Sequence, residues 1–236
     1  MKDKVVLITG GSQGYGKAAA KLFAQNGAKV IAAARTQCTL EEAQIESGFD
    51  SYICMDVTSA DDWEKIAYQH VMDRYGRLDV LINNAGGAIK VADISEQSVE
   101  NIDKIIKLNL NSVIYGSRVF AKLMKKQKSG TIINVTSACA KQAWPGWSVY
   151  AAAKWGVLGF SKNLYVDVQP HNVRVTCLIP GAGATDFMKN AGGENLDMKL
   201  QAEDVAQTML DICKLPDHVI IEEVSVWGID QVVIPL

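Results

Sequence analysis

Short apolar runs alternate along the chain with longer segments whose apolar residues recur at helical spacing. The apolar runs predict strands that are buried on both faces, and the segments between them are long enough to form helices. The expected strands are 4–9, 28–34, 51–55, 78–82, 131–136, 172–178 and 219–227. The expected helices are 15–26, 39–47, 61–75, 96–127, 148–168 and 202–213. This alternation predicts an α/β fold, with a doubly wound parallel β-sheet of about seven strands and helices on both faces.

The length and composition are those of one globular domain. The 236 residues contain no repeat and no proline- or glycine-rich linker, so we expect residues 1–236 to form a single domain. A net charge of −2 gives no reason to expect nucleic acid or a membrane as a partner. The first apolar run, Val5 to Ile8, is too short for a signal peptide or a membrane span. The five cysteines show no metal-ligand spacing, which predicts no metal site and a reduced, cytoplasmic protein.

Glycines follow the first predicted strand directly, in Thr9-Gly-Gly-Ser-Gln-Gly-Tyr-Gly16, and a helical pattern begins at once. Glycine lets the backbone approach a ligand closely, and a helix N-terminus offers free N–H groups to a pyrophosphate. With Ala19 as its last small residue, the segment fits the dinucleotide-binding fingerprint of Rossmann-like folds. A glycine-rich turn without a ligand is the alternative. We expect cofactor contacts from Gly10, Ser12, Gln13, Gly14, Tyr15 and Gly16.

The end of the second predicted strand bears on which dinucleotide is bound. Sites that prefer NAD have an acidic residue there, which binds the ribose 2′-hydroxyl. Here Ala34 is followed by Arg35, whose guanidinium can pair with a 2′-phosphate. We therefore expect NADP(H) to be favoured over NAD(H), the alternative being an arginine that contacts only solvent. Asp56, which follows the third strand, is placed to contact the adenine, although it could equally cap the next helix.

Several polar residues follow other predicted strands or lie on predicted helices. Tyr150 and Lys154 are four residues apart and would share one face of the helix at 148–168. That spacing alone is weak, because an exposed tyrosine and a solvated lysine give the same pattern. Ser137 follows the fifth strand, and Asn109 lies inside a predicted helix, where asparagine is a poor helix former. We expect these groups to gather at the carboxyl end of the sheet, beside the glycine turn.

Taken in order, these segments resemble the short-chain dehydrogenase/reductase family of the single-domain type, over residues 4–230. The matching motifs are Thr9-Gly-x-x-x-Gly14-x-Gly16, Asp56-Val57, Asn83-Asn84-Ala85-Gly86, Asn109, Ser137, Tyr150-x-x-x-Lys154 and Pro180-Gly181-x-x-x-Thr185. The resemblance implies a catalytic set of Asn109, Ser137, Tyr150 and Lys154. Tyr150 would be the general acid and base, and Ser137 would hold the substrate oxygen. Lys154 would favour the phenolate and bind the nicotinamide ribose, and Asn109 would keep a water for proton relay.

The same resemblance completes the expected cofactor site with Asp56, Val57, Asn83, Ala85, Gly86, Tyr150, Lys154, Pro180, Gly181 and Thr185. This chain departs from the family pattern in three places. Members that prefer NADP often have a basic residue in the glycine turn, where this chain has Gln13, and Tyr15 replaces a small aliphatic residue. The glycine pair that often follows the last strand is missing, and the tail 231–236 is apolar. The family further implies a homodimer or homotetramer.

The expected substrate site lies between Ser137 and Tyr150, where the sequence places two tryptophans. Trp144 and Trp147 would lie near the substrate, and Phe187, in a flap near 181–200, could close the other side. Tryptophans packed on a helix or subunit face are the alternative, as is an ordinary surface loop for the flap. An aromatic pocket suits an apolar or mixed carbonyl compound, such as a ketone, an aldehyde or a 3-oxoacyl group. A sugar or polyol stays open as a further candidate.

The expected function is therefore that of an NAD(P)(H)-dependent oxidoreductase that interconverts a carbonyl and an alcohol by hydride transfer. The alternative is a catalytically silent dinucleotide-binding regulatory or scaffold protein, which would not need Ser137, Tyr150 and Lys154 together. A hydrolase is disfavoured because Ser137 lacks a nucleophile elbow and the three histidines occupy no informative position.

Overall fold

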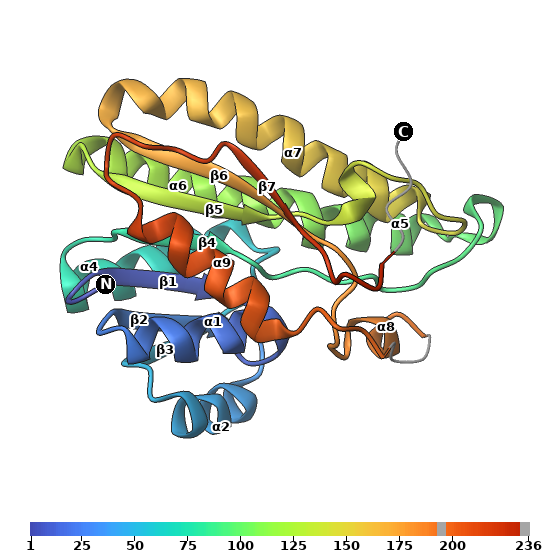
Figure 1. The fold of residues 1–236 in the computed structure, drawn as a ribbon, viewed down its shortest axis with the longest axis horizontal. Helices are drawn as coiled ribbons and strands as arrows, with labels where there is room; N and C mark the ends of the chain where they lie inside the picture. Colours follow the sequence, from blue (N-terminus) through green and yellow to red (C-terminus); the bar gives the residue numbers. More distant parts are fainter. Residues whose placement is uncertain (193–196, 232–236) are drawn as a thin grey trace.

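The computed structural model describes residues 1–192 and 197–231, and seven parallel strands form one sheet at its centre (Figure 1). The strands are β1 (Val5–Thr9), β2 (Lys29–Ala34), β3 (Ser51–Cys54), β4 (Val80–Asn83), β5 (Gly130–Val135), β6 (Val173–Pro180) and β7 (Glu223–Val226). Their order across the sheet is β3-β2-β1-β4-β5-β6-β7. The chain winds in one direction from β1 to β3 and in the other from β4 to β7, which confirms the predicted doubly wound, Rossmann-like fold.

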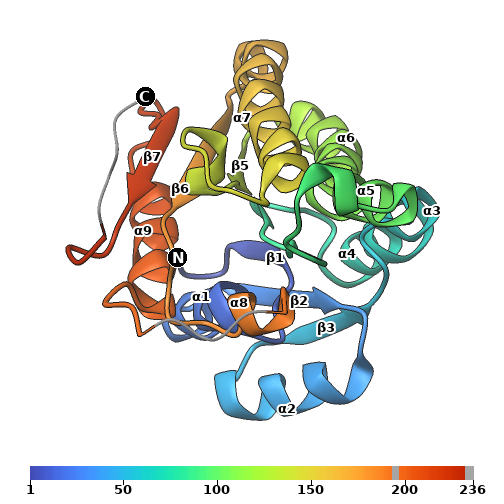
Figure 2. The ribbon, with the colours of Figure 1, turned by 90° about the vertical axis from the view of Figure 1, so that its right-hand side faces the viewer.

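Helices cover both faces of the sheet (Figure 2). Alternate residues of β1 point to opposite faces, so Val5 and Leu7 belong to one hydrophobic core, and Val6 and Ile8 to the other. The helices that pack on the first face are α4 (Tyr68–Tyr75), α6 (Ser112–Gln127) and α7 (Ser148–Val168). Those on the second face are α1 (Gly14–Gln25), α2 (Gln37–Ser47) and α9 (Ala202–Lys214). Burial on both faces explains why the strands are almost wholly apolar in sequence.

Two of the predicted helices are interrupted by π turns. The helix predicted over 96–127 consists of a short 3-10 turn (Ile94–Glu96), α5 (Val99–Ile106), a π turn (Lys107–Asn111) and α6. The helix predicted over 61–75 consists of α3 (Ala60–Asp62), a π turn (Trp63–Ala67) and α4. A π turn adds one residue to a helical turn without ending the helix, so the apolar spacing alone did not reveal it. The π turn at Lys107–Asn111 contains Asn109.

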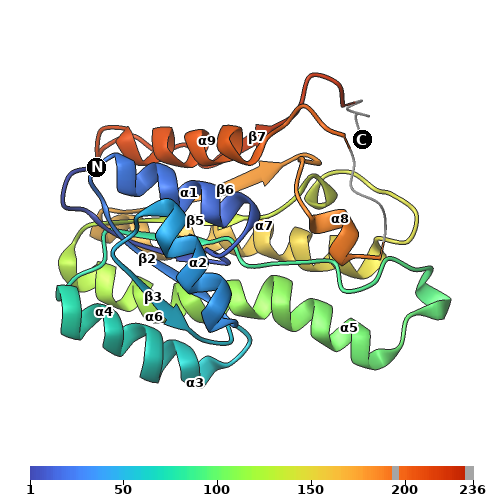
Figure 3. The ribbon, with the colours of Figure 1, turned by 90° about the horizontal axis from the view of Figure 1, so that it is seen from below.

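The carboxyl ends of all seven strands lie at one end of the sheet, where the short helix α8 (Phe187–Asn190) also lies (Figure 3). This helix belongs to the predicted flap at 181–200, of which residues 193–196 fall outside the described residues. Ala191 and Leu200 are buried and anchor the flap on both sides of that gap. Within the described chain, no helix is both long enough and apolar enough to cross a membrane.

Candidate active site

The glycine turn between β1 and α1 is shaped to accept an anion. Gly10 and Gly14 have φ of 66° and 52°, a region that side chains other than glycine rarely adopt. A Cβ on Gly16 would overlap the carbonyl of Gly10, so only glycine fits there. Gln13 precedes α1 without a side-chain cap, and the first turn contains no acidic residue. The first N–H groups of α1 are therefore available to a pyrophosphate, as the sequence predicts.

Thr9 and Asn84 tie this turn to the carboxyl end of β4. The Thr9 hydroxyl accepts hydrogen bonds from the backbone N–H groups of Asn84 (2.9 Å) and Ala85 (3.0 Å). The Asn84 amide donates in return to the Thr9 carbonyl, over 2.8 Å. Both residues are part of the matching motifs, but their role as a brace between two strands depends on contacts that only the fold creates.

Asn83 is predicted to line the cofactor site, but its side chain points into the core. Its amide donates to the Asn134 side chain (2.8 Å) and to the Ser117 hydroxyl (3.1 Å), and the residue is only 2% exposed. The Asn134 amide donates further to Ser161 on α7. Only the main chain of Asn83 is left to meet a cofactor, and its side chain joins β4 and β5 to the helices beneath the site.

The end of β2 combines an exposed cation with a second open helix N-terminus. Arg35 is exposed, and no described residue pairs with its guanidinium. Helix α2 begins two residues later, and its N-cap Thr36 makes no side-chain cap, with no acidic residue in the first turn. We call Arg35, Thr36 and this first turn the α2 rim. The sequence pattern placed the start of this helix at residue 39. It therefore missed that the N-terminus of α2, which attracts anions, lies next to Arg35.

Asp56 and Val57 lie beyond β3, next to the same rim. The Asp56 carboxylate accepts hydrogen bonds from the backbone N–H and the hydroxyl of Thr58, both at 2.9 Å. The N-cap of the following helix is Ser59, whose hydroxyl accepts from the Asp62 N–H, so Asp56 does not cap that helix. Val57 is buried, and its carbonyl accepts from the indole of Trp63. The contact of Asp56 with an adenine stays a prediction.

Four polar residues, Asn109, Ser137, Tyr150 and Lys154, meet at the carboxyl ends of β4 and β5, and we call them the reaction centre. Tyr150 and Lys154 share the buried face of α7, with the lysine Nζ 5.6 Å from the centre of the tyrosine ring. Lys154 Nζ also donates to the carbonyl of Val135 at the end of β5, over 3.1 Å. Ser137 follows β5, and its side chain hydrogen-bonds to Tyr150. The structure thus brings the four predicted catalytic residues together.

Burial perturbs both titratable groups of the reaction centre. Tyr150 is 6% exposed, and burial raises its pKa above the usual value, while the hydrogen bond with Ser137 acts in the opposite direction. Lys154 is 2% exposed, and burial lowers its pKa to about 8. Both shifts have the same cause, because a low-dielectric surrounding disfavours the charged form of each group. A buried proton donor beside an easily neutralised ammonium is typical of a site that moves protons.

Asn109 holds the loop that follows β4. It is fully buried in the π turn, and its amide donates to the carbonyls of Gly87 (2.8 Å) and Ile105 (3.0 Å). Its carbonyl oxygen accepts from the Gly87 N–H over 3.0 Å. A Cβ on the adjacent Gly86 would lie 2.9 Å from that oxygen and 3.2 Å from the Lys154 Nζ, so the loop closely approaches the reaction centre. The side chain of Asn109 is thereby committed to loop geometry, and its predicted water relay stays a prediction.

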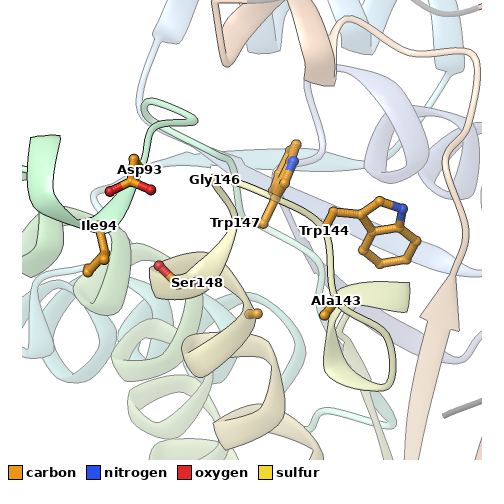
Figure 4. A pocket seen from close by; sticks show the side chains of 8 residues that line it. Asp93, Ile94, Ala143, Trp144, Gly146, Trp147 and Ser148 are labelled. Carbon is orange, nitrogen blue, oxygen red and sulfur yellow. The ribbon is translucent and has the colours of Figure 1, made fainter.

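Of the three aromatic residues predicted near the substrate, two contact Tyr150. The rings of Trp147 and Phe187 lie edge-on to the Tyr150 ring, with centroids 5.4 Å and 5.7 Å away. Trp144 is 39% exposed and lines a hollow of about 240 Å³ with Trp147 and the facing segment at Asp93 (Figure 4). Trp147 therefore borders both this hollow and the reaction centre, whereas Trp144 lines only the hollow.

The segment after β6, predicted to border the nicotinamide, is held from two sides. Gly181 lies against the side chains of Trp227 and Gln231, and the Gln231 amide donates to the Ala182 carbonyl. From the glycine turn, the Tyr15 hydroxyl lies so close to Gly183 that a Cβ there would clash with it. Burial raises the pKa of Tyr15 to about 12. The tail residues 232–236 fall outside the described residues, but Gln231 shows that the chain beyond β7 reaches the cleft.

Thr185 and Pro180 complete the predicted cofactor contacts. Pro180 ends β6 and is buried in the sheet beside Val226 of β7. The methyl group of Thr185 would lie 3.8 Å from a Cβ on Gly14, so this residue faces the glycine turn across the cleft. The glycine turn, the β4 loop and the flap therefore meet at the carboxyl ends of the strands, although they come from three distant parts of the sequence. Gly14 and Thr185 line one hollow between the turn and the flap.

Comparison with known proteins shows to which family the chain belongs. The family model for short chain dehydrogenases matches residues 4–195. A 3-oxoacyl-(acyl-carrier-protein) reductase from Thermotoga maritima is 37% identical over 224 residues, which cover 93% of this chain and 88% of that protein. An alcohol dehydrogenase from the archaeon Thermococcus sibiricus, complexed with 5-hydroxy-NADP, has a TM-score of 0.88 and 28% identity over 98% of each chain. Levodione reductase has a TM-score of 0.90 and 27% identity over 97% of each chain. The chain is an oxidoreductase that belongs to the short-chain dehydrogenase/reductase family.

Proposed function

We propose that the protein reduces a ketone, aldehyde or 3-oxoacyl group to an alcohol with NADPH, or catalyses the reverse oxidation, with Tyr150 as the general acid and base. The observation that carries the proposal is the convergence of Ser137 and Lys154 on a buried Tyr150, beside an uncapped helix N-terminus. A dinucleotide-binding scaffold would gain nothing from burying a lysine at this place, because desolvation of an ammonium costs free energy.

Each group of the reaction centre has a distinct task. The Ser137 hydroxyl binds the carbonyl oxygen of the substrate, and the Tyr150 hydroxyl gives its proton to the alkoxide that forms there. Lys154, held by the Val135 carbonyl, stabilises the resulting phenolate and binds the nicotinamide ribose. The side chain of Asn109 fixes the loop at Gly87. Its place beside the reaction centre supports the proposed role of keeping a water in line to return the proton. When bound, the cofactor supplies or accepts the hydride.

The residues present fit a nicotinamide dinucleotide. The open N-terminus of α1 would hold the pyrophosphate, and Asp56, Val57 and the loop at Ala85–Gly86 would line the adenosine half. Pro180, Gly181 and Thr185 would border the nicotinamide. The α2 rim supports a preference for NADP(H), because it offers a guanidinium and free N–H groups and no carboxylate to repel a 2′-phosphate. The complex of the Thermococcus sibiricus relative with an NADP derivative agrees with this choice.

The remaining proposals concern the protein as a whole. The substrate approaches past Trp147 and Phe187, with the flap at 181–200 closing over it. The protein works as a homodimer or homotetramer, as the family resemblance implies. Its five cysteines, among them the exposed Cys38 and Cys54, are all free thiols, which favours a reducing, cytoplasmic surrounding.

Replacing the catalytic phenol tests the proposed reaction. Tyr150→Phe keeps the ring packing and removes only the hydroxyl, so kcat for NADPH-dependent carbonyl reduction should fall by about a thousandfold. The Kd for NADPH, measured by fluorescence titration, should change by less than about twofold. Tyr165→Phe on the same helix is the matched control and should keep full activity. Tyr150→Phe with more than a tenth of the wild-type rate would contradict the acid role. A wild-type protein that binds NADPH but reduces no carbonyl would support the scaffold alternative.

A further inference from the structure

Trp147 and Phe187 form a parallel aromatic pair over the reaction centre. Their rings are inclined by only 12°, and their centroids are 6.1 Å apart. The two residues come from different elements, since Trp147 directly precedes α7 and Phe187 is the first residue of α8. Both rings also meet the Tyr150 ring edge-on. A molecule held between the two rings would therefore have one edge beside the tyrosine.

The buried side chains that pack with this pair are apolar. The buried residues of the cluster that contains Tyr150 are Ala88, Ile105, Cys139, Val149 and Ala191. Among the described aspartate, glutamate, lysine and arginine residues, only Asp79 and Lys154 are buried. Asp79 lies at the opposite end of the sheet, where it accepts from the N–H of Val5, the first residue of β1. Lys154 is held by the Val135 carbonyl. Apart from this lysine, a carboxylate, ammonium or phosphate between the two rings would be desolvated without a buried partner of opposite charge among the described residues, which is costly.

Trp147 and Phe187 stack on each other in the structure. The 6.1 Å joins the two ring centroids, so the spacing between the nearly parallel ring planes is no larger than this. Carbon atoms in contact are separated by about 3.5 Å, so a flat ring between the two needs about 7 Å between their planes, and the rings must separate to admit it. Phe187 belongs to the four-residue helix α8, which lies between loops, so a displacement of α8 would open the pair. A flexible acyl chain would gain little there, because it has no flat face to stack and loses rotational freedom.

From this arrangement we infer that the substrate is an uncharged cyclic ketone with a flat, aromatic or conjugated part that lies between Trp147 and Phe187. The inference rests on the proposed function and narrows its substrate class. In the reaction, the carbonyl carbon accepts a hydride from NADPH and the carbonyl oxygen accepts the Tyr150 proton, giving the alcohol and NADP⁺. Solvent then returns the proton to the tyrosine.

Two bicyclic ketones with one carbon skeleton test the inference. In 2-tetralone one ring is aromatic, in trans-2-decalone both rings are saturated, and neither carbonyl is conjugated, so their intrinsic reactivities are similar. Stacking on two ring faces should make kcat/KM with NADPH about tenfold higher for 2-tetralone. Trp147→Leu and Phe187→Leu retain apolar volume without a flat face, and each should reduce this preference to about threefold. Trp155→Leu, at an exposed site on α7, is the matched control and should leave the preference unchanged.

A binding measurement separates recognition from turnover. In the presence of NADP⁺, 2-naphthol should raise the melting temperature of the wild type and of Trp155→Leu, and should do so less for Trp147→Leu. Equal kcat/KM for the two ketones, or a preference that survives both leucine variants, would overturn the inference and leave the proposed function standing. Reduction of an acetoacetyl thioester but of neither ketone would do the same. No reduction of any carbonyl would overturn the proposed function, and the inference with it.

Discussion

The reaction centre and the α2 rim lie at the same end of the sheet and are built in opposite ways. In the reaction centre, Asn109 and Lys154 are buried, and each makes hydrogen bonds to main-chain atoms of other elements. At the rim, Arg35 is exposed and its guanidinium has no described partner. The first region therefore depends on the packing of several elements, whereas the second is one side chain beside a helix N-terminus.

Because of this difference, we expect the buried reaction centre to determine the chemistry of the protein, and the exposed rim to determine which cofactor it prefers. A buried, hydrogen-bonded group keeps its position and acquires a shifted pKa, but its replacement disturbs the fold around it. An exposed group can be exchanged with little effect on stability, so a preference that it controls is easily altered. We expect substitutions in the reaction centre to change stability or proton transfer, and substitutions at the rim to change only which cofactor is bound.

Among the substitutions that test this difference, the largest expected effect is at the rim. Arg35→Asp replaces the proposed 2′-phosphate partner with a carboxylate that repels it, and the ratio of kcat/KM for NADPH to that for NADH should fall about a hundredfold, or about 2.7 kcal/mol. The melting temperature should stay within about one degree of the wild type. Arg74→Asp on α4 makes the same charge change away from the site and should leave the ratio unaltered. An unchanged ratio for Arg35→Asp would refute the assigned contact.

The second effect is on stability and concerns Asn109. Asn109→Ala removes the bonds to Gly87 and Ile105 and should lower the free energy of unfolding by about 2 kcal/mol, measured by urea denaturation. Asn163→Ala is the control, because that amide makes a comparable bond to the Gly159 carbonyl but is exposed. It should cost less than about 0.5 kcal/mol. If both variants lost the same free energy of unfolding, the buried hydrogen bonds of Asn109 would contribute no more to stability than a bond at the surface, which would contradict the prediction.

The third effect follows from the lowered pKa of Lys154. With a pKa of about 8, the ammonium loses its proton as the pH rises through 8, so kcat/KM for NADPH should fall about tenfold between pH 8 and 9.5. Tyr150 does not titrate in this interval without cofactor, because its pKa is raised above the usual value. Lys154→Arg keeps its charge and should remove the alkaline decline, whereas Lys162→Arg, exposed on the same helix, should retain it. A wild-type profile that is flat up to pH 9.5 would exclude the lysine as the titrating group.

Much of the architecture was predictable because it depends on local pattern. Apolar runs bounded by helical segments gave the seven strands, and the glycine turn followed from residues that are adjacent in sequence. The spacing of Tyr150 and Lys154 sufficed to place both on one helix face. The sequence-based prediction was wrong where no local pattern marks the structure, as in the two π turns and in the first turn of α2.

The orientation of side chains could not be predicted in the same way. Asn83 and Asn84 are neighbours with the same side chain, yet one amide points into the core at Asn134 and the other at the glycine turn. Successive residues near a strand end face opposite sides, and which side holds the cofactor depends on how neighbouring strands pair. Likewise, the closeness of Phe187 to Trp147 joins residues forty positions apart, and no sequence period records it.

The sequence by itself determined the family, the order of the elements and the residue types available for hydride transfer chemistry, because these are written in short motifs and in periodic burial. The tertiary structure alone decided that the lysine is buried enough to have its pKa lowered, that Asn109 braces a loop, and that two distant aromatic rings lie parallel over the tyrosine. The physical reason is that burial and stacking depend on which surfaces meet in three dimensions, which chain order does not specify.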